Sequence, residues 1–327
     1  MSNAAKTKSQ FIQNCEDVLK NAEDVQINYE NLKKFATALK VPTGDAYGWN
    51  EYLSAKALGT EPANFYLIFT DLMVITAQNA GYLYKGRNGK TSKWEIDNSG
   101  AKALLKFFNT AAEKKALPSS VPSLSDRQRW DLSGMLSNVP FSKERFAIFE
   151  ETCSVDAANA IQQLEKLSKG DNSYAFDMNS VEFLAEKFPK AYGDDPYRKK
   201  AVLLLLMVAG HLRSRGVEVE LNDLIVPADY RIPETLNAAG VIKMSDDMIK
   251  RIEGGELFDQ NDKAVTELRA ASIKAVNEIC RLSSLNIDQV DLALWMASRD
   301  GTLERLKNEN KDIKVANTHL ACKSMWF

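Results

Sequence analysis

Apolar side chains recur at intervals of three and four residues along most of this 327-residue sequence. This spacing gathers them on one face of an α-helix, whereas a half-buried strand needs strict alternation. The pattern is clear in residues 10–25, 262–282 and 286–309, each of which we expect to form a helix. The apolar run 201–210 fits a buried helix and is too short to span a bilayer. The sequence therefore predicts a mainly α-helical protein.

One short region departs from the helical pattern. Residues 81–96 carry aromatic and β-branched side chains on both sides of GRNGK, a sequence typical of a hairpin turn. We predict a small strand pair there. A loop at 118–124, rich in Pro and Ser, places a boundary near residue 120 between a helical region 1–120 and a helical region 121–327. The two regions are expected to form one compact unit.

Composition restricts the class of partner. The net charge is −2, so no global positive field draws the chain to nucleic acid. Only two histidines and four widely separated cysteines are present, so we expect free thiols and no metal or other cofactor. The polar start of the chain lacks the apolar core of a signal peptide. These features favour a soluble cytoplasmic protein that does not bind membranes.

The stretch VPADYRIPETLNAAGVI combines a short predicted helix with a group of chemically active side chains. Pro233 opens the helix, Gly240 ends it, and Asp229, Tyr230 and Arg231 precede it. Amide groups at a helix start attract negative charge, so Asp229 either caps the turn or presents its carboxylate to a substrate. Arg231 has the planar fork that binds a carboxylate or phosphate through two hydrogen bonds.

Three basic residues lie at the start of the apolar helix that is predicted to follow Pro196 and Tyr197. Arg198, Lys199 and Lys200 lie in its first turn, where positive charge opposes the helix dipole and suggests a partner anion. We expect Arg198 and Lys200 to be solvated. Lys199 is the candidate for binding a phosphate or, after losing its proton, for acting as a nucleophile.

Two further pairs are candidates for substrate binding. Asp291 and Trp295 are four residues apart and therefore share a helix face, although a tryptophan there is more often part of a core. Asn64 and Asp71 interrupt a strongly apolar run, where buried polar groups need hydrogen-bond partners. Each pair either lines a pocket or consists of structural groups whose hydrogen bonds are made within the fold.

With these segments in order, the chain resembles the queuosine salvage protein family, the queuosine 5′-phosphate N-glycosylases. The resemblance rests on ADYRIPETLNAAGVI, ELRAASIKAVNEI and IDQVDLALWMA, with NFYLIFTDLM, VEFLAEKFPKAY and YRKKA earlier in the chain. It implies an α-helical fold related to helix-hairpin-helix DNA glycosylases and cleavage of an N-glycosidic bond. It also implies that Asp229 is the catalytic aspartate and that Lys199 lies in the pocket.

The chain departs from the family pattern at several positions. The family has an Asn and a Phe-Trp pair soon after the residue matched by Asp71, where this chain has LMVITAQNAG. A family Trp and Glu are replaced by Lys274 and Asn277, and the terminal His-His-Arg-Thr-Arg run leaves only His319 and Lys323 as candidates for substrate binding. These changes affect expected base-recognition and phosphate-binding positions.

Our first hypothesis is a nucleotide N-glycosidase. An ionised carboxylate below C1′ stabilises the cationic sugar and activates the attacking water. Asp229 is the candidate for that role, with Tyr66, Tyr230 or Trp295 stacking on the base. Lys199 would neutralise the substrate phosphate. The identity of the base and the oligomeric state remain open.

Two alternatives have distinct signatures. A DNA glycosylase would extrude a modified base into the same pocket and contact phosphates through RNGK and HLRSRG, and its Lys199 would form a Schiff base at C1′. The near-neutral charge argues against it. A non-enzymatic helical binding module is favoured if Asp229 is buried in an ion pair with Arg231 and no pocket opens beside it.

Overall fold

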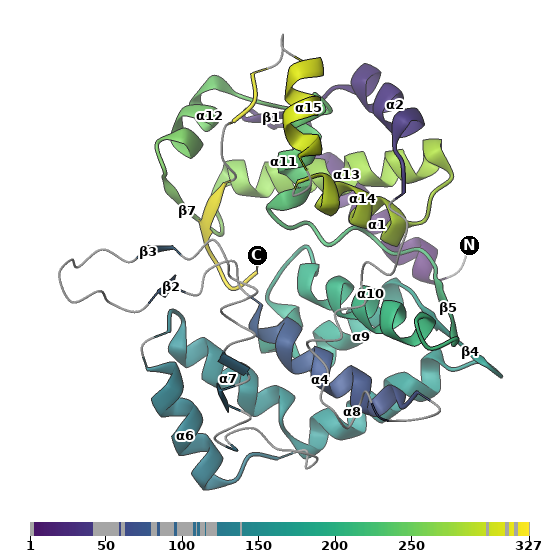
Figure 1. Cartoon of the computed structure of the whole chain (residues 1–327), viewed down its shortest axis with the longest axis vertical. Helices are drawn as coiled ribbons and strands as arrows, with labels where there is room; N and C mark the ends of the chain where they lie inside the picture. Colours follow the sequence, from purple (N-terminus) through teal and green to yellow (C-terminus); the bar gives the residue numbers. More distant parts are fainter. Residues whose placement is uncertain are drawn as a thin grey trace. The chain divides into compact units, whose positions relative to one another are not determined.

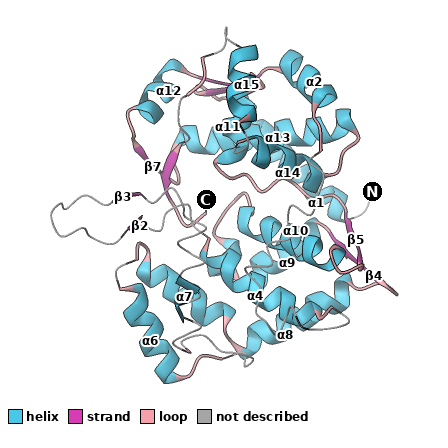
Figure 2. Cartoon of the chain, in the orientation of Figure 1, coloured by secondary structure: helices cyan, strands magenta, loops and turns pink. Residues whose placement is uncertain are grey.

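Helices dominate the computed structural model, and the strands among its described residues pair in two-stranded sheets (Figure 2). The prediction of a mainly α protein with small β elements is therefore confirmed. The structure describes residues 3–41, 59, 63–79, 84–85, 95–96, 107–108, 110–111, 115, 123–137, 139–298, 301–310, 314–316 and 320–326.

The chain folds into two compact units, each assembled from separate segments. Neither unit has a boundary near residue 120, and both take segments from the regions 1–120 and 121–327. The first unit contains Met1–Tyr47, Phe176–Asn179 and Leu221–Lys323, and the second contains Gly48–Ala175, Ser180–Glu220 and Ser324–Phe327.

Helix α13 (Lys263–Ser283) is the central element of the first unit (Figure 1). Its buried face is rich in alanine, which lets neighbouring helices approach closely. It packs against α1 (Asn3–Lys20), α2 (Tyr29–Ala38), α11 (Arg231–Ala238) and α14 (Ile287–Ala297). The unit also contains β1 (Val25–Ile27), β6 (Ile242–Met244), α12 (Asp246–Glu253), β7 (Leu257–Asp259), α15 (Thr302–Glu309) and β8 (Ala321–Lys323).

A buried carboxylate fixes the start of β1 to α13. Glu267 is 1% exposed. Its Oε1 accepts a hydrogen bond from the amide of Glu23 at 3.2 Å, and its Oε2 accepts from those of Asp24 at 2.8 Å and Val25 at 3.2 Å. Strand β1 then pairs antiparallel with β6, with Val25 opposite Met244. A single side chain thus satisfies three backbone donors that the sheet leaves unpaired.

Helices α4 (Phe65–Gln78) and α10 (Lys199–Arg213) pack against each other in the second unit. Both are apolar on most faces, which explains why other elements surround them. Those elements are α6 (Asp126–Leu136), α7 (Ser142–Thr152), α8 (Val155–Ser168), α9 (Met178–Lys187) and the π-helix η2 (Pro189–Gly193).

The predicted strand pair near residues 81–96 is confirmed. Strand β2 (Tyr84–Lys85) pairs antiparallel with β3 (Glu95–Ile96). The turn sequence between them lies outside the described residues. A further two-stranded sheet joins β4 (Ser173–Phe176) and β5 (Glu218–Leu221).

One helix prediction is wrong in its extent. The pattern in 286–309 suggested one long helix. It is divided into α14 and α15 because Gly301 has a φ of +84°, which a right-handed helix does not allow.

Lys200 is buried rather than solvated, contrary to the sequence prediction. It is 3% exposed, and its Nζ donates a hydrogen bond to the carbonyl of Ala77 at 2.7 Å. The guanidinium of Arg145, also buried, donates to the carbonyl of Gln78 at 2.6 Å. Both cations therefore lie at the C-terminal end of α4, where unpaired carbonyls and the helix dipole attract positive charge. Burial, with the neighbouring charges of Arg145 and Lys199, holds the pKa of Lys200 well below its usual value of 10.5.

This burial predicts a pH dependence of stability. Because the unfolded chain keeps the Lys200 proton up to a pKa of 10.5 and the folded chain loses it at lower pH, stability should rise with pH between these two values. Replacing Lys200 by methionine should remove that rise. Urea unfolding followed by circular dichroism between pH 6.5 and 8.5 compares the two slopes. Equal slopes would show that Lys200 is protonated in the fold.

The described residues contain neither a disulfide nor a cluster suited to a metal ion. All four cysteines are free, as predicted, and no three His, Cys, Asp or Glu side chains converge within the described ranges. Burial raises the pKa of the Cys15 and Cys322 thiols to about 12 and that of Cys153 to about 11. These thiols are therefore poor nucleophiles at neutral pH. None of the described helices has the length and apolar character needed to cross a bilayer.

Candidate functional site

The carboxylate of Asp229 closes the turn that leads into α11. Its Oδ1 accepts hydrogen bonds from the amides of Arg231 at 2.8 Å and Ile232 at 3.1 Å. Among the described residues, no group donates a hydrogen bond to Oδ2, and the side chain is half-buried. The capping role considered from the sequence is therefore present, and it occupies one carboxylate oxygen only.

Arg231 pairs with Glu234 and not with Asp229. Its Nη1 lies 3.0 Å from Glu234 Oε2, and its guanidinium carbon is 5.2 Å from the centre of the Tyr230 ring. Burial raises the pKa of Glu234, although Arg231 opposes that shift. The ion pair between Asp229 and Arg231, which was expected of a non-enzymatic module, is not formed. The carboxylate that Arg231 binds belongs to its own helix.

Arg269 is a residue that the sequence reasoning did not single out. This side chain of α13 is 2% exposed, and its Nε donates to the carbonyl of Ala228 at 3.2 Å. It thereby holds the peptide that precedes Asp229. The sequence pattern that could have indicated Arg269 is its charge within LRAASI, where the other side chains are small or apolar.

Helix α14 is hydrogen-bonded to α11, the helix that follows the Asp229 turn. Thr235 on α11 donates its hydroxyl hydrogen to the carbonyl of Leu294 at 2.9 Å. Asp291 and Trp295 lie on α14, the first buried and the second half-buried. At the end of the unit, Lys323 is exposed on β8, which pairs in parallel with β7. His319 lies outside the described residues.

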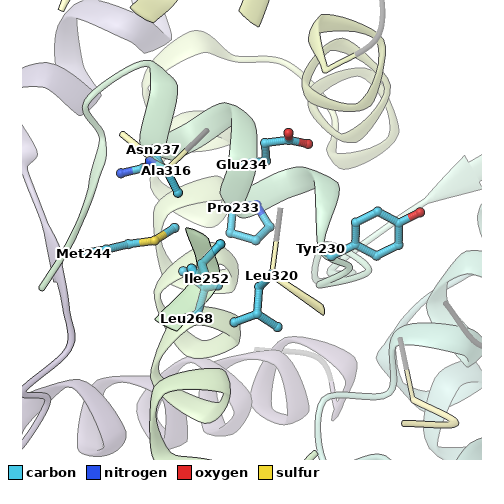
Figure 3. A pocket seen from close by; sticks show the side chains of 9 residues that line it. All are labelled: Tyr230, Pro233, Glu234, Asn237, Met244, Ile252, Leu268, Ala316 and Leu320. Atoms are coloured by element: carbon cyan, nitrogen blue, oxygen red, sulfur yellow. The ribbon is translucent and has the colours of Figure 1, made fainter. Parts of the chain in front are cut away.

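An apolar pocket lies beside α11 (Figure 3). The polar groups of Asn237 are already used, because its Nδ2 donates to the carbonyl of Ile242 and its Oδ1 accepts from the amide of Ala316. The ring of Tyr230 points away from the other lining side chains. The lining residues are Tyr230, Pro233, Glu234, Asn237, Met244, Ile252, Leu268, Ala316 and Leu320.

The remaining candidates belong to the second unit. Asn64 is exposed and precedes α4, where its Oδ1 accepts from the amide of Leu67 at 3.0 Å. Its reading as a buried core group is therefore wrong, because the helix begins one residue later. Asp71 is half-buried on α4, and Tyr66 lines a groove with residues of α8. Lys199 is the first residue of α10 and is buried.

A DNA glycosylase was expected to contact phosphates through the segments HLRSRG and RNGK. In HLRSRG, the guanidinium of Arg213 donates to the carbonyl of Val219 through Nε at 3.0 Å and Nη2 at 2.6 Å. RNGK is not among the described residues.

Lys274, at a position where the resembled family has a tryptophan, forms an ion pair with Glu16 of α1. That substitution therefore joins two helices of the first unit.

Comparison with known proteins identifies a matching family and three relatives of low sequence identity. Residues 102–326 match the model of the queuosine salvage protein family. Three proteins named queuosine 5′-phosphate N-glycosylase/hydrolase align with the chain. The protein of Sphaerobacter thermophilus is 24% identical over 85% of this chain and 88% of its own length. That of Mus musculus is 24% identical over 94% and 89%, and that of Schizosaccharomyces pombe is 22% identical over 98% and 100%.

Proposed function

Because this chain belongs to the queuosine salvage protein family, we propose that it hydrolyses the N-glycosidic bond of queuosine 5′-phosphate or a similar modified nucleotide. The names of the three relatives supply the substrate class and the type of reaction. Their alignments extend over most of both chains, so the proposal concerns the whole protein and not a shared fragment.

The proposal rests on the different surroundings of the two carboxylate oxygens of Asp229. Oδ1 is held by the amides of Arg231 and Ile232, and Arg269 holds the preceding carbonyl. This arrangement fixes the carboxylate while Oδ2 accepts no hydrogen bond from the described residues. A preorganised negative group of this kind stabilises positive charge that develops in a transition state.

The proposed reaction breaks the bond between C1′ and the base nitrogen. The bonding electrons leave with the base, and positive charge develops on the sugar ring. Oδ2 of Asp229 stabilises that charge and accepts a hydrogen bond from a water molecule, whose oxygen bonds to C1′. One proton of this water finally reaches the departing base, and the other remains on the new anomeric hydroxyl.

Lys199 is proposed to bind the 5′-phosphate. The first turn of α10 contains two lysines, and Lys199 is buried there. A buried ammonium at a helix start favours an anionic partner such as a phosphate. A binding role is supported over Schiff-base chemistry by the relatives' description as hydrolases.

Tyr230 is the leading candidate for stacking on the base, because it follows Asp229 in the chain and its ring points away from the other side chains that line the apolar pocket (Figure 3). Roles in substrate binding for Arg231, Asp291 and Trp295 remain predictions. The same holds for Asn64, Asp71, Tyr66, His319 and Lys323.

Incubation with queuosine 5′-phosphate tests the function directly. Released queuine is measured by mass spectrometry, with DNA that contains modified bases as a parallel substrate. We expect release from the nucleotide. Release from DNA alone would assign the chemistry to a polymer, and no release from either substrate would contradict the proposed activity.

A further inference from the structure

Two buried basic side chains lie together in the second unit, at the C-terminal end of α4. Arg145 is 1% exposed and Lys200 is 3% exposed. Arg145 belongs to α7 and Lys200 to α10, so both reach α4 from other helices. Their charges are close enough that Arg145 contributes to the lowered pKa of Lys200. Two like charges in one buried region are costly unless an anion offsets them.

Protein groups satisfy these two cations only in part. Nζ of Lys200 donates to the carbonyl of Ala77 at 2.7 Å. Arg145 donates through Nη1 to the carbonyl of Gln78 at 2.6 Å and through Nε to that of Pro140 at 2.9 Å. All three acceptors are neutral, and no carboxylate among the described residues forms an ion pair with either cation. The hydrogen bonds therefore fix the cations without balancing their charge.

One donor and one acceptor of this cluster have no hydrogen-bond partner in the described part of the chain. They are Nη2 of Arg145 and Oε1 of Gln78, and both atoms are buried. The two side chains hold each other, because Arg145 Nη1 donates to the Gln78 carbonyl while Gln78 Nε2 donates to the Arg145 carbonyl at 2.9 Å. Buried polar atoms are nearly always paired. Two such atoms on fixed, adjacent side chains indicate a bound group that both accepts and donates.

We propose that Arg145, Lys200 and Gln78 form a binding site for a small oxyanion that retains a proton, such as hydrogen phosphate or bicarbonate. An oxygen of the anion accepts from Nη2 of Arg145, and its O–H group donates to Oε1 of Gln78. Its negative charge offsets those of Arg145 and Lys200. The site lies within the second unit and does not depend on the proposed activity. A water molecule supplies the same two hydrogen bonds but no charge.

Urea unfolding of the full chain at neutral pH, in phosphate and in sulfate of equal ionic strength, tests the site. Both anions stabilise proteins in general because they are excluded from the surface. Sulfate has no proton to donate to Gln78, so it should add only this general effect. We expect the equilibrium constant for unfolding to be about 10-fold lower in phosphate than in sulfate, once phosphate exceeds its Kd by about 10-fold. Bicarbonate should act as phosphate does, and chloride as sulfate does.

Substitutions assign the effect to the cluster. Lys200→Met removes one charge, and Arg145→Lys keeps a charge but lacks Nη2, so each should weaken phosphate binding about 10-fold or more. Lys166→Met, at an exposed position of α8, is the matched control and should leave the difference between phosphate and sulfate unchanged. The difference should also persist in Lys199→Ala protein, which lacks the proposed ligand of the substrate phosphate.

Three results would overturn the proposal. The first is equal stability of the parent protein in phosphate and sulfate, which would leave water as the bound group. The second is an undiminished difference in Lys200→Met protein, which gives an answer even if Arg145→Lys does not fold. The third is loss of the difference in Lys199→Ala protein alone, which would place the anion at Lys199.

Discussion

Replacing Asp229 by asparagine should lower the rate of queuine release by about 10²-fold to 10³-fold while the fold is preserved. Asparagine retains the carbonyl oxygen that can accept from the amides of Arg231 and Ile232, so the cap of α11 survives. The variant loses only the negative charge on the oxygen that would face the sugar. Single-turnover kinetics with queuosine 5′-phosphate measure the rate, and a thermal melt verifies the fold.

Asp229→Ala is the matched comparison. It removes both the charge and the cap, so it should lose activity to a similar extent and also about 1 kcal/mol of stability. Activity of Asp229→Asn close to that of the parent would show that the carboxylate has only its structural role. The catalytic assignment would then be wrong, even if the protein hydrolysed the nucleotide.

Replacing Glu267 by alanine should have the largest effect on stability, a loss of about 1–3 kcal/mol for the buried amide that is left without an acceptor. The change leaves the amides of Glu23, Asp24 and Val25 without their acceptor, and the hydrogen bond of Val25 is buried. A domain of ordinary stability has only about 5–15 kcal/mol in total. Urea unfolding measures the loss, and amide hydrogen exchange at residues 23–25 should accelerate.

Glu267→Gln separates shape from charge. Glutamine fills the same space and offers one acceptor oxygen, so its loss should be clearly smaller than that of alanine. Equal losses for the two variants would mean that the charge, rather than the number of accepted hydrogen bonds, stabilises the junction. Unchanged stability in both would show that water reaches these amides in the folded protein.

The capping contact of Asp229 could be predicted from the sequence because it is local. Asp229 precedes a helix whose amides are its immediate neighbours, so its capping contact follows from residues two and three positions ahead. The resemblance to the family added the activity. Arg269 could not be assigned a role in the same way, because its partner Ala228 is 41 residues away and only the packing of α11 against α13 brings them together.

The sequence by itself determined the helical class, the strand pair near residues 81–96 and the family, because these depend on periodicity and on order along the chain. Tertiary structure decided the burial of Lys200, the break between α14 and α15, and the division into two units built from discontinuous segments. It also decided that Lys274 pairs with Glu16 of α1. The physical reason is that burial and ion pairing depend on which distant groups lie near in space. Residue spacing describes only the faces of a single helix, so it places a charge on a face without giving that charge its partner.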